Sequence, residues 1–185
     1  GVPTLLWGHG YSKDESAIRR RTRNRLLNLS DGCLLYNSSA ARQLASEGFD
    51  PKRLFVAQNA LDQGPIDAAR TNWLNRPDAL RDFRRSHGLP EHATALFISR
   101  LEADKRIDLL LRAFAIVVRA RPEARLAVIG RGSEEAALRT LSTQLGIERN
   151  ILFAGSVYEE EHLAPWLLSA SCMAYPVAIG LSIFH

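Results

Sequence analysis

The chain has 185 residues, 46% of them hydrophobic and 24% charged, a balance that supports a packed core and excludes general disorder. No apolar run reaches the ~18 residues that a membrane-spanning helix needs, and no N-terminal stretch has the pattern of a secretory signal. The net charge of +4 mildly favours an anionic partner.

The two cysteines, Cys33 and Cys172, both stand among apolar residues. We expect small buried hydrophobic side chains there, with no disulfide and no metal site, which predicts a cytoplasmic protein. Gly1 in place of an initiator Met, and a helix-like pattern at residues 180–185, suggest a piece of a longer gene product.

Short apolar runs alternate with helical patterns along the whole chain, which predicts βα units, a mainly parallel sheet and therefore an α/β fold. The expected strands are residues 4–7, 32–36, 54–57, 93–99, 125–129, 151–153 and 172–175. Helices are expected at residues 18–29, 38–47, 78–87, 107–118 and 133–145. In the last of these, Ser133 is the expected N-cap.

Between residues 59 and 90 the rhythm breaks, because prolines and polar residues replace any strand pattern. We therefore expect a domain boundary near Gly64, with an incomplete Rossmann-like domain at residues 1–64 and a second, truncated one at residues 65–185. Two such domains are expected to face each other across a hinge.

Arg100 and Lys105 follow the expected strand 93–99 and precede a helix. Ligands of open α/β sheets bind at the carboxyl ends of strands, so two cations there predict a phosphate site. The alternative is a solvated loop in which Glu102 and Asp104 neutralise both cations.

Gly130 and Gly132 form a tight turn between a strand and a helix, where a ligand is able to approach the backbone closely. A plain tight turn is an equally good interpretation. Glu135 occupies the third-glycine position of a dinucleotide fingerprint and would repel a pyrophosphate, which disfavours a nicotinamide-dependent dehydrogenase.

Three further loops contain candidate residues. The loop at residues 155–158 is suited to border a flat base, and its candidates are Ser156, Val157 and Tyr158. An ordinary βα loop before a helix with an acidic first turn is the simpler interpretation. The turn Gly180, Leu181 and Ser182 resembles a helix entry with free N–H groups for a phosphate, and His185 lies on its first turn. His9, between two glycines at the end of the first strand, is expected to be exposed.

The segment from Arg19 to Arg25 carries five arginines, and Ile18, Thr22, Leu26 and Leu29 share one helix face. Such a helix is able to contact an anionic membrane surface, although a solvated helix face is the simpler interpretation. Nucleic acid is not an expected partner, because the sequence has no zinc pattern and no aromatic stacking platform beside the basic run.

Taken in order, these motifs resemble retaining glycosyltransferases of family 4, which have the GT-B fold. The matching segments are SRLEADKRIDLLLRAF, ARLAVIGRGSEEAALRTL and NILFAGSVYEEEHLAPWLLSASCMAYP, and the upstream SDGCLLYNSSAARQLASEGFDPKRLFVAQNALD resembles the end of the family's N-terminal domain. The resemblance covers nearly the whole chain and is most specific from Phe97 to Pro176.

The resemblance implies a function and assigns roles to residues. The protein would move a sugar from a UDP-, GDP- or ADP-sugar to an acceptor hydroxyl with retention of configuration, without a metal or other cofactor. Arg100 and Lys105 would hold the diphosphate and His9 would face the cleft. Gly130, Gly132 and the loops at 156–158 and 180–182 would bind the donor, and His185 would reach its ribose.

The chain departs from the family pattern at several positions. Val177 and His185 replace two glutamates, Arg106 replaces the glycine after the lysine, and Ala60 replaces the glycine after Asn59. An inactive homologue that binds a nucleotide is therefore an alternative. The acceptor would be a glycan, a lipid-linked sugar or a small molecule, and the cytoplasmic protein would be free or peripheral on the inner face of the membrane.

Overall fold

A computed structural model describes residues 2–10, 15–58, 60 and 62–177 of the chain. It divides into two compact units, Gly1–Ala60 and Leu61–His185. The sequence had placed this boundary after residue 64. Each unit is a parallel sheet with helices, and each is described by itself.

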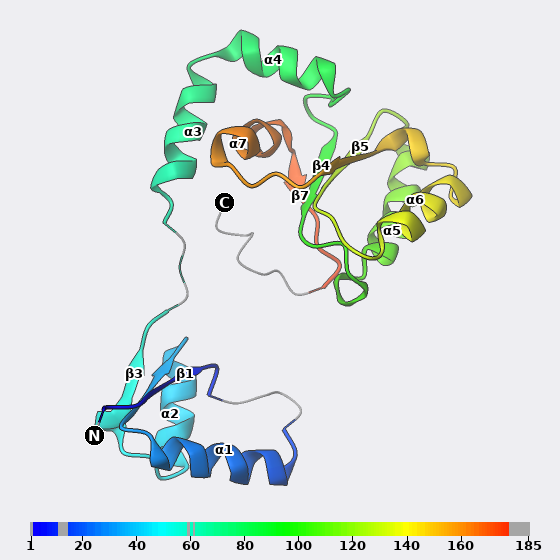
Figure 1. Ribbon diagram of the computed structural model, residues 1–185. Helices are drawn as coiled ribbons and strands as arrows, with labels where there is room; N and C mark the ends of the chain where they lie inside the picture. The colour runs from blue at the N-terminus through cyan, green and yellow to red at the C-terminus, as the bar shows by residue number, and fades with distance from the viewer. Residues whose placement is uncertain (1, 11–14, 59, 61, 178–185) are drawn as a thin grey trace. The chain divides into compact units, whose positions relative to one another are not determined.

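The first unit has a three-stranded parallel sheet in the order β1-β2-β3 (Figure 1). Its elements are β1 (Leu5–Gly8), α1 (Ala17–Leu29), β2 (Gly32–Leu35), α2 (Ser38–Ser46), a 3-10 turn (Pro51–Arg53) and β3 (Leu54–Val56). The central strand β2 supplies the core side chains Cys33 and Leu35, which pack with Leu27, Ala40 and Leu44.

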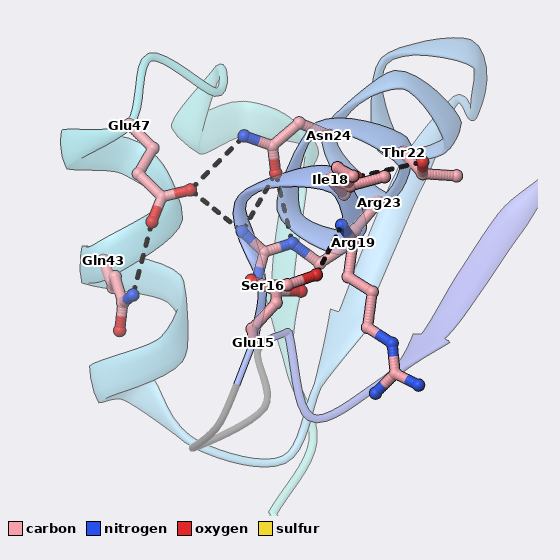
Figure 2. Close-up of polar contacts among 9 residues, drawn as sticks. All are labelled: Glu15, Ser16, Ile18, Arg19, Thr22, Arg23, Asn24, Gln43 and Glu47. Atoms are coloured by element: carbon pink, nitrogen blue, oxygen red, sulfur yellow. Dashed lines mark hydrogen bonds and ion pairs between the residues drawn. The ribbon is translucent and has the colours of Figure 1, made fainter.

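Helix α1 leaves exposed the apolar face that its sequence pattern indicated. Leu27 is its buried residue, whereas Ile18 and Leu29 are 77% and 83% exposed. Arg23, expected on the solvent side, instead reaches Glu47 of the α2 C-cap at 3.1 Å and Glu15 at 2.9 Å (Figure 2). An ion-pair network therefore connects α1 to the end of α2.

The second unit contains a four-stranded parallel sheet in the order β6-β5-β4-β7. Its strands are β4 (Thr94–Ile98), β5 (Arg125–Ile129), β6 (Ile151–Gly155) and β7 (Cys172–Met173). The helices α5 (Ile107–Ala120) and α6 (Glu135–Gln144) cover one face, and α7 (Glu160–Ser169) covers the other (Figure 1).

Strand β5 shows why the sheet is stable between two helix layers. Leu126 and Val128 pack towards α5 and α6, whereas Ala127 and Ile129 pack towards α7. All four are at most 1% exposed. A strand buried on both faces needs such a continuous apolar run, which is why the sequence predicted it well.

Helices α3 (Gly64–Leu74) and α4 (Pro77–Ser86) precede this sheet. The sequence predicted α4 but not α3, because α3 has a weak apolar pattern and Pro65 near its start. Proline is compatible with a first helical turn, where its missing N–H leaves no bond unmade. Packing against α7 stabilises α3: Trp73 donates from Nε1 to the carbonyl of Glu161 at 2.8 Å.

Two other predictions were wrong. Ser133 does not cap α6; its hydroxyl donates to the Glu102 carboxylate at 2.8 Å, and Glu134 occupies the N-cap position. Cys172 is exposed, because β7 is an edge strand, whereas Cys33 is buried and burial raises the pKa of its thiol.

In the part of the chain that the structure describes, no helix has the length and apolar character needed to cross a bilayer.

Candidate functional site

The order of the strands in the second unit defines a topological switch point. From β4 the chain proceeds outward through β5 to β6, and it then returns to add β7 on the opposite side of β4. Ligands of such sheets bind at the carboxyl ends of the strands where the direction reverses. The residues that follow β4, among them Ser99 and Arg100, lie at that point.

Backbone hydrogen bonds join the loops at the carboxyl ends of β4, β5 and β6. Leu101 N–H donates to the carbonyl of Arg131 at 2.9 Å, and Gly130 N–H donates to the carbonyl of Gly155 at 2.8 Å. Ser99 N–H also donates to the carbonyl of Ile129 at 3.1 Å. These bonds hold the loops against one another, so that their side chains share one surface.

Close backbone packing explains both glycines of the turn after β5. A Cβ atom at Gly130 would lie 1.9 Å from the carbonyl oxygen of Ser99, and its φ of 141° is one that residues with side chains rarely adopt. A Cβ atom at Gly132 would lie 2.2 Å from the carbonyl oxygen of Leu101. The glycines therefore allow this loop to pass against the loop that follows β4.

A hollow of about 330 Å³ opens where these loops meet. It is lined by Ile98, Ser99, Arg100, Ile129, Gly130, Arg131, Ser156, Val157 and Tyr158. The structure thus brings together five residues that the sequence proposed from three separate loops: Arg100, Gly130, Ser156, Val157 and Tyr158. This volume lies within the range of small-ligand pockets.

Lys105, the second expected cation, does not line this hollow. Its Nζ lies 2.9 Å from Asp104 Oδ2, an ion pair within the turn Ala103–Lys105. The hydrogen bond from Lys105 lowers the pKa of Asp104, with further contributions from the charges of Lys105 and Arg100. The solvated-loop alternative therefore holds for Lys105, which Asp104 neutralises. It does not hold for Glu102, which bonds to Ser133 and not to either cation.

Arg106 adopts a left-handed conformation with φ 50° and ψ 41°. This is the position at which the resembled family has glycine, and the backbone geometry supplies the reason. Its guanidinium forms an ion pair with Asp108 at 3.1 Å, which raises the pKa of Arg106 and lowers that of Asp108. The turn into α5 is therefore kept despite the larger side chain.

The remaining predicted residues lie elsewhere. Gly132 supports the turn but is not part of the hollow's lining. His9 belongs to the first unit, where it is exposed and its ring lies 4.5 Å from that of Tyr36. The turn Gly180, Leu181 and Ser182, together with His185, falls outside the described residues.

Arg131 lines the hollow but received no role from the sequence. Its side chain is exposed, and its guanidinium lies 3.7 Å from where a Cβ of Gly155 would be. The sequence could have indicated this role, because Arg131 immediately follows β5, beside the loop that carries Arg100.

Among the described residues, no group of three or more side chains is arranged to hold a metal ion.

Comparison with known proteins identifies the family of the chain. Residues 81–179, more than half of the chain, match the family described as Glycosyl transferases group 1. A D-inositol 3-phosphate glycosyltransferase of Thermomonospora curvata is 33% identical over 173 residues, which are 88% of this chain and 39% of that protein. A GDP-mannose-dependent alpha-(1-6)-phosphatidylinositol monomannoside mannosyltransferase of Mycolicibacterium smegmatis is 25% identical over 154 residues, 83% of this chain and 38% of that protein.

Solved structures show the same fold. Anabaena Alr3699/HepE in complex with UDP superposes with a TM-score of 0.68 at 17% identity, over 92% of this chain and 46% of that one. A glycosyltransferase from Rickettsia africae superposes with a TM-score of 0.66 at 14% identity, over 91% and 44% of the two chains. The GT-B-like α/β fold is thereby confirmed, and the chain spans less than half the length of these proteins.

Proposed function

Because the chain belongs to the family of glycosyl transferases group 1, we propose that its second unit binds a nucleotide-diphosphate sugar and that the protein transfers the sugar to an acceptor hydroxyl. The observation that carries the proposal is the hollow at the switch point, with Arg100 at the exit of β4. Neither the carboxyl end of a parallel strand nor an arginine alone specifies a nucleotide, but together they suit its diphosphate.

The chemistry requires a fixed positive charge at the leaving group. As the bond between the anomeric carbon and the β-phosphate oxygen breaks, the electron pair stays on that oxygen, the acceptor oxygen bonds to the anomeric carbon, and the proton of the acceptor hydroxyl passes to the leaving phosphate. Arg100 would stabilise the charge that develops on the phosphate. Lys105 would join it by turning from Asp104, an exposed partner that binds it only weakly.

The loop at residues 156–158 would border the nucleobase, and Gly130 would present backbone to the donor. With protein cations at the diphosphate, the reaction would need no divalent metal. We further propose that the enzyme is a retaining transferase of family 4, which an anomeric assignment of the product by NMR would test. A product of inverted configuration would reject the retaining assignment and leave donor binding intact.

Nucleotide binding is the direct test of the proposed site. Calorimetric titration of the chain with UDP, GDP and ADP should show saturable binding of at least one, and Arg100→Ala should weaken that binding at least tenfold. Arg119→Ala, an exposed arginine in the last turn of α5, is the matched control and should bind as the wild type does. Equal binding by the Arg100 variant would reject the proposal.

Turnover tests the reaction itself. With a nucleotide-sugar donor, release of the nucleotide should fall about 10²–10³-fold in Arg100→Ala, the loss typical of removing one charge-stabilising donor. His9→Ala should lower turnover without changing the nucleotide affinity, as expected for a residue on the acceptor side. If the wild type binds a nucleotide tightly but transfers no sugar, the alternative of an inactive homologue that only binds a nucleotide is supported.

We also propose that helix α1 contacts an anionic membrane surface on the cytoplasmic side. The supporting observation is the exposure of Ile18, Leu26 and Leu29, which are 57–83% accessible on a helix that also carries exposed arginines. Such an amphipathic helix binds by inserting apolar side chains beside lipid phosphates. A lipid-linked acceptor would suit this arrangement.

Sedimentation with vesicles tests the membrane proposal. The chain should bind vesicles that contain phosphatidylglycerol and not vesicles of phosphatidylcholine alone. Leu26→Asp should abolish binding, whereas Ile116→Asp, at a comparably exposed apolar position on α5, should not. Binding that survives Leu26→Asp, or that both variants lose equally, would reject a role for α1.

A further inference from the structure

Arg131 brings a second guanidinium to the candidate site, beside that of Arg100. Among the described residues, its side chain has no hydrogen bond or ion pair, although all four arginines of helices α4 and α6 are paired with carboxylates. It is exposed and lines the hollow together with Arg100 and the loop at residues 156–158. Its charge is therefore available to a ligand in that hollow.

The position of Arg131 differs from that of Arg100. Arg100 follows β4, the strand at the switch point, whereas Arg131 follows β5 and lies over Gly155 at the end of β6. The guanidinium is 3.7 Å from the Cβ position of Gly155, immediately before Ser156. Its side chain thus lies at the part of the hollow where the proposed function places the nucleobase.

The carbonyl of Arg131 is itself fixed by Leu101 N–H, and the neighbouring Gly130 N–H is bonded to Gly155. These bonds hold the backbone of Arg131 against both adjacent loops. A side chain that starts from an anchored backbone loses less entropy when it binds a ligand than one on a free loop.

We infer that Arg131 selects the base of the donor nucleotide, favouring a base with carbonyl oxygens, uracil or guanine, over adenine. This inference rests on the proposed function. A guanidinium has only N–H donors, so it matches the O4 of uracil or the adjacent O6 and N7 acceptors of guanine. Adenine instead places an amino donor beside its N7, which opposes the guanidinium.

Binding of three nucleotides to four proteins tests the inference. The wild type should bind UDP or GDP at least tenfold more tightly than ADP, in line with the discrimination of a well-formed arginine–base contact. Arg131→Ala should lose about tenfold for the favoured nucleotide and leave ADP binding unchanged. Arg131→Lys, which keeps the charge and loses the planar fork, should lose most of the selectivity.

The matched control is Arg149→Ala, in the turn Glu148–Asn150 at the opposite end of β6, which removes the same charge and should change nothing. The inference is wrong if Arg131→Ala binds all three nucleotides as the wild type does. It is also wrong if all three weaken equally, which would assign Arg131 to the phosphates, or if Arg131→Lys keeps full selectivity.

Failure of the proposed function gives a different result. If the wild type binds none of the three nucleotides, both the donor site and the base-selecting role of Arg131 are rejected. If the wild type binds a nucleotide and Arg100→Ala weakens that binding, the donor site stands whatever the Arg131 variants do. The two sets of variants therefore separate the two claims.

Discussion

Both units of the chain are built on a parallel sheet, yet their strands are buried to very different extents. In the second unit, Leu126 and Val128 are inaccessible, with helices on both faces of the sheet. In the first, Leu5, Trp7 and Phe55 are 54%, 68% and 51% exposed on the two outer strands. Parallel sheets are normally covered on both faces.

The more deeply buried sheet is the one that carries the candidate site. The family match at residues 81–179 lies in the second unit, as does the hollow with Arg100 and Arg131. The first unit holds a smaller core, and its outer strands expose large apolar side chains. Four pairs of substitutions test these differences.

The largest effect is expected in the central strand of the second unit. Leu126→Ala should lower the free energy of unfolding of that unit by about 3 kcal/mol, because it leaves a cavity in a fully packed core. Leu5→Ala, at the exposed edge of the first sheet, should cost less than about 1 kcal/mol. Urea titration with hydrogen exchange read separately for each unit measures both; equal costs would remove the contrast.

The turn after β5 should be nearly as sensitive. Gly130→Ala should destabilise the second unit by about 2–3 kcal/mol, since its methyl group would collide with the backbone of Ser99. Gly88→Ala is the matched control: it also has a positive φ, 63°, but open space around its Cβ position, and should cost only about 1 kcal/mol. A control variant as damaging as Gly130→Ala would show that conformation, and not loop packing, sets the cost.

In the first unit, which buries few apolar side chains, polar contacts should contribute to the free energy of unfolding. Arg23→Ala should destabilise that unit by about 2 kcal/mol, because it removes the cation that pairs with the half-buried carboxylates of Glu15 and Glu47. Arg19→Ala should change stability by less than about 0.5 kcal/mol, since its exposed side chain points away from α2 (Figure 2). Thermal unfolding of the two variants compares them, and equal values would reject a structural role for the network.

The smallest expected effect is an increase in the stability of the second unit. Arg106→Gly should stabilise the second unit by about 0.5–1 kcal/mol, because it relieves a left-handed conformation, although glycine adds entropy to the unfolded chain. Arg112→Gly, at an exposed interior position of α5, should instead destabilise by about 1 kcal/mol. A loss of stability in the Arg106 variant would show that its ion pair with Asp108 outweighs the strain.

Strands β4 and β5 were predictable because buried parallel strands are continuous apolar runs. Arg100 and the residues at 156–158 were predictable as a group, since parallel strands present their carboxyl ends at one edge of the sheet. Lys105 was proposed for the same site, but its neighbour Asp104 binds its Nζ, and a sequence pattern does not decide between such partners. Helix α3 was missed because its stability comes from packing against α7.

By itself, the amino-acid sequence determined the α/β class, the order of most elements and the strand ends that carry the candidate residues, because local periodicity and turn residues encode these. Only the tertiary structure shows which strands are neighbours and which residues a side chain at Gly130 or Gly132 would collide with. It also shows that Arg131 shares a hollow with Arg100. Those features arise from contacts between residues far apart in the chain, and no local pattern specifies them.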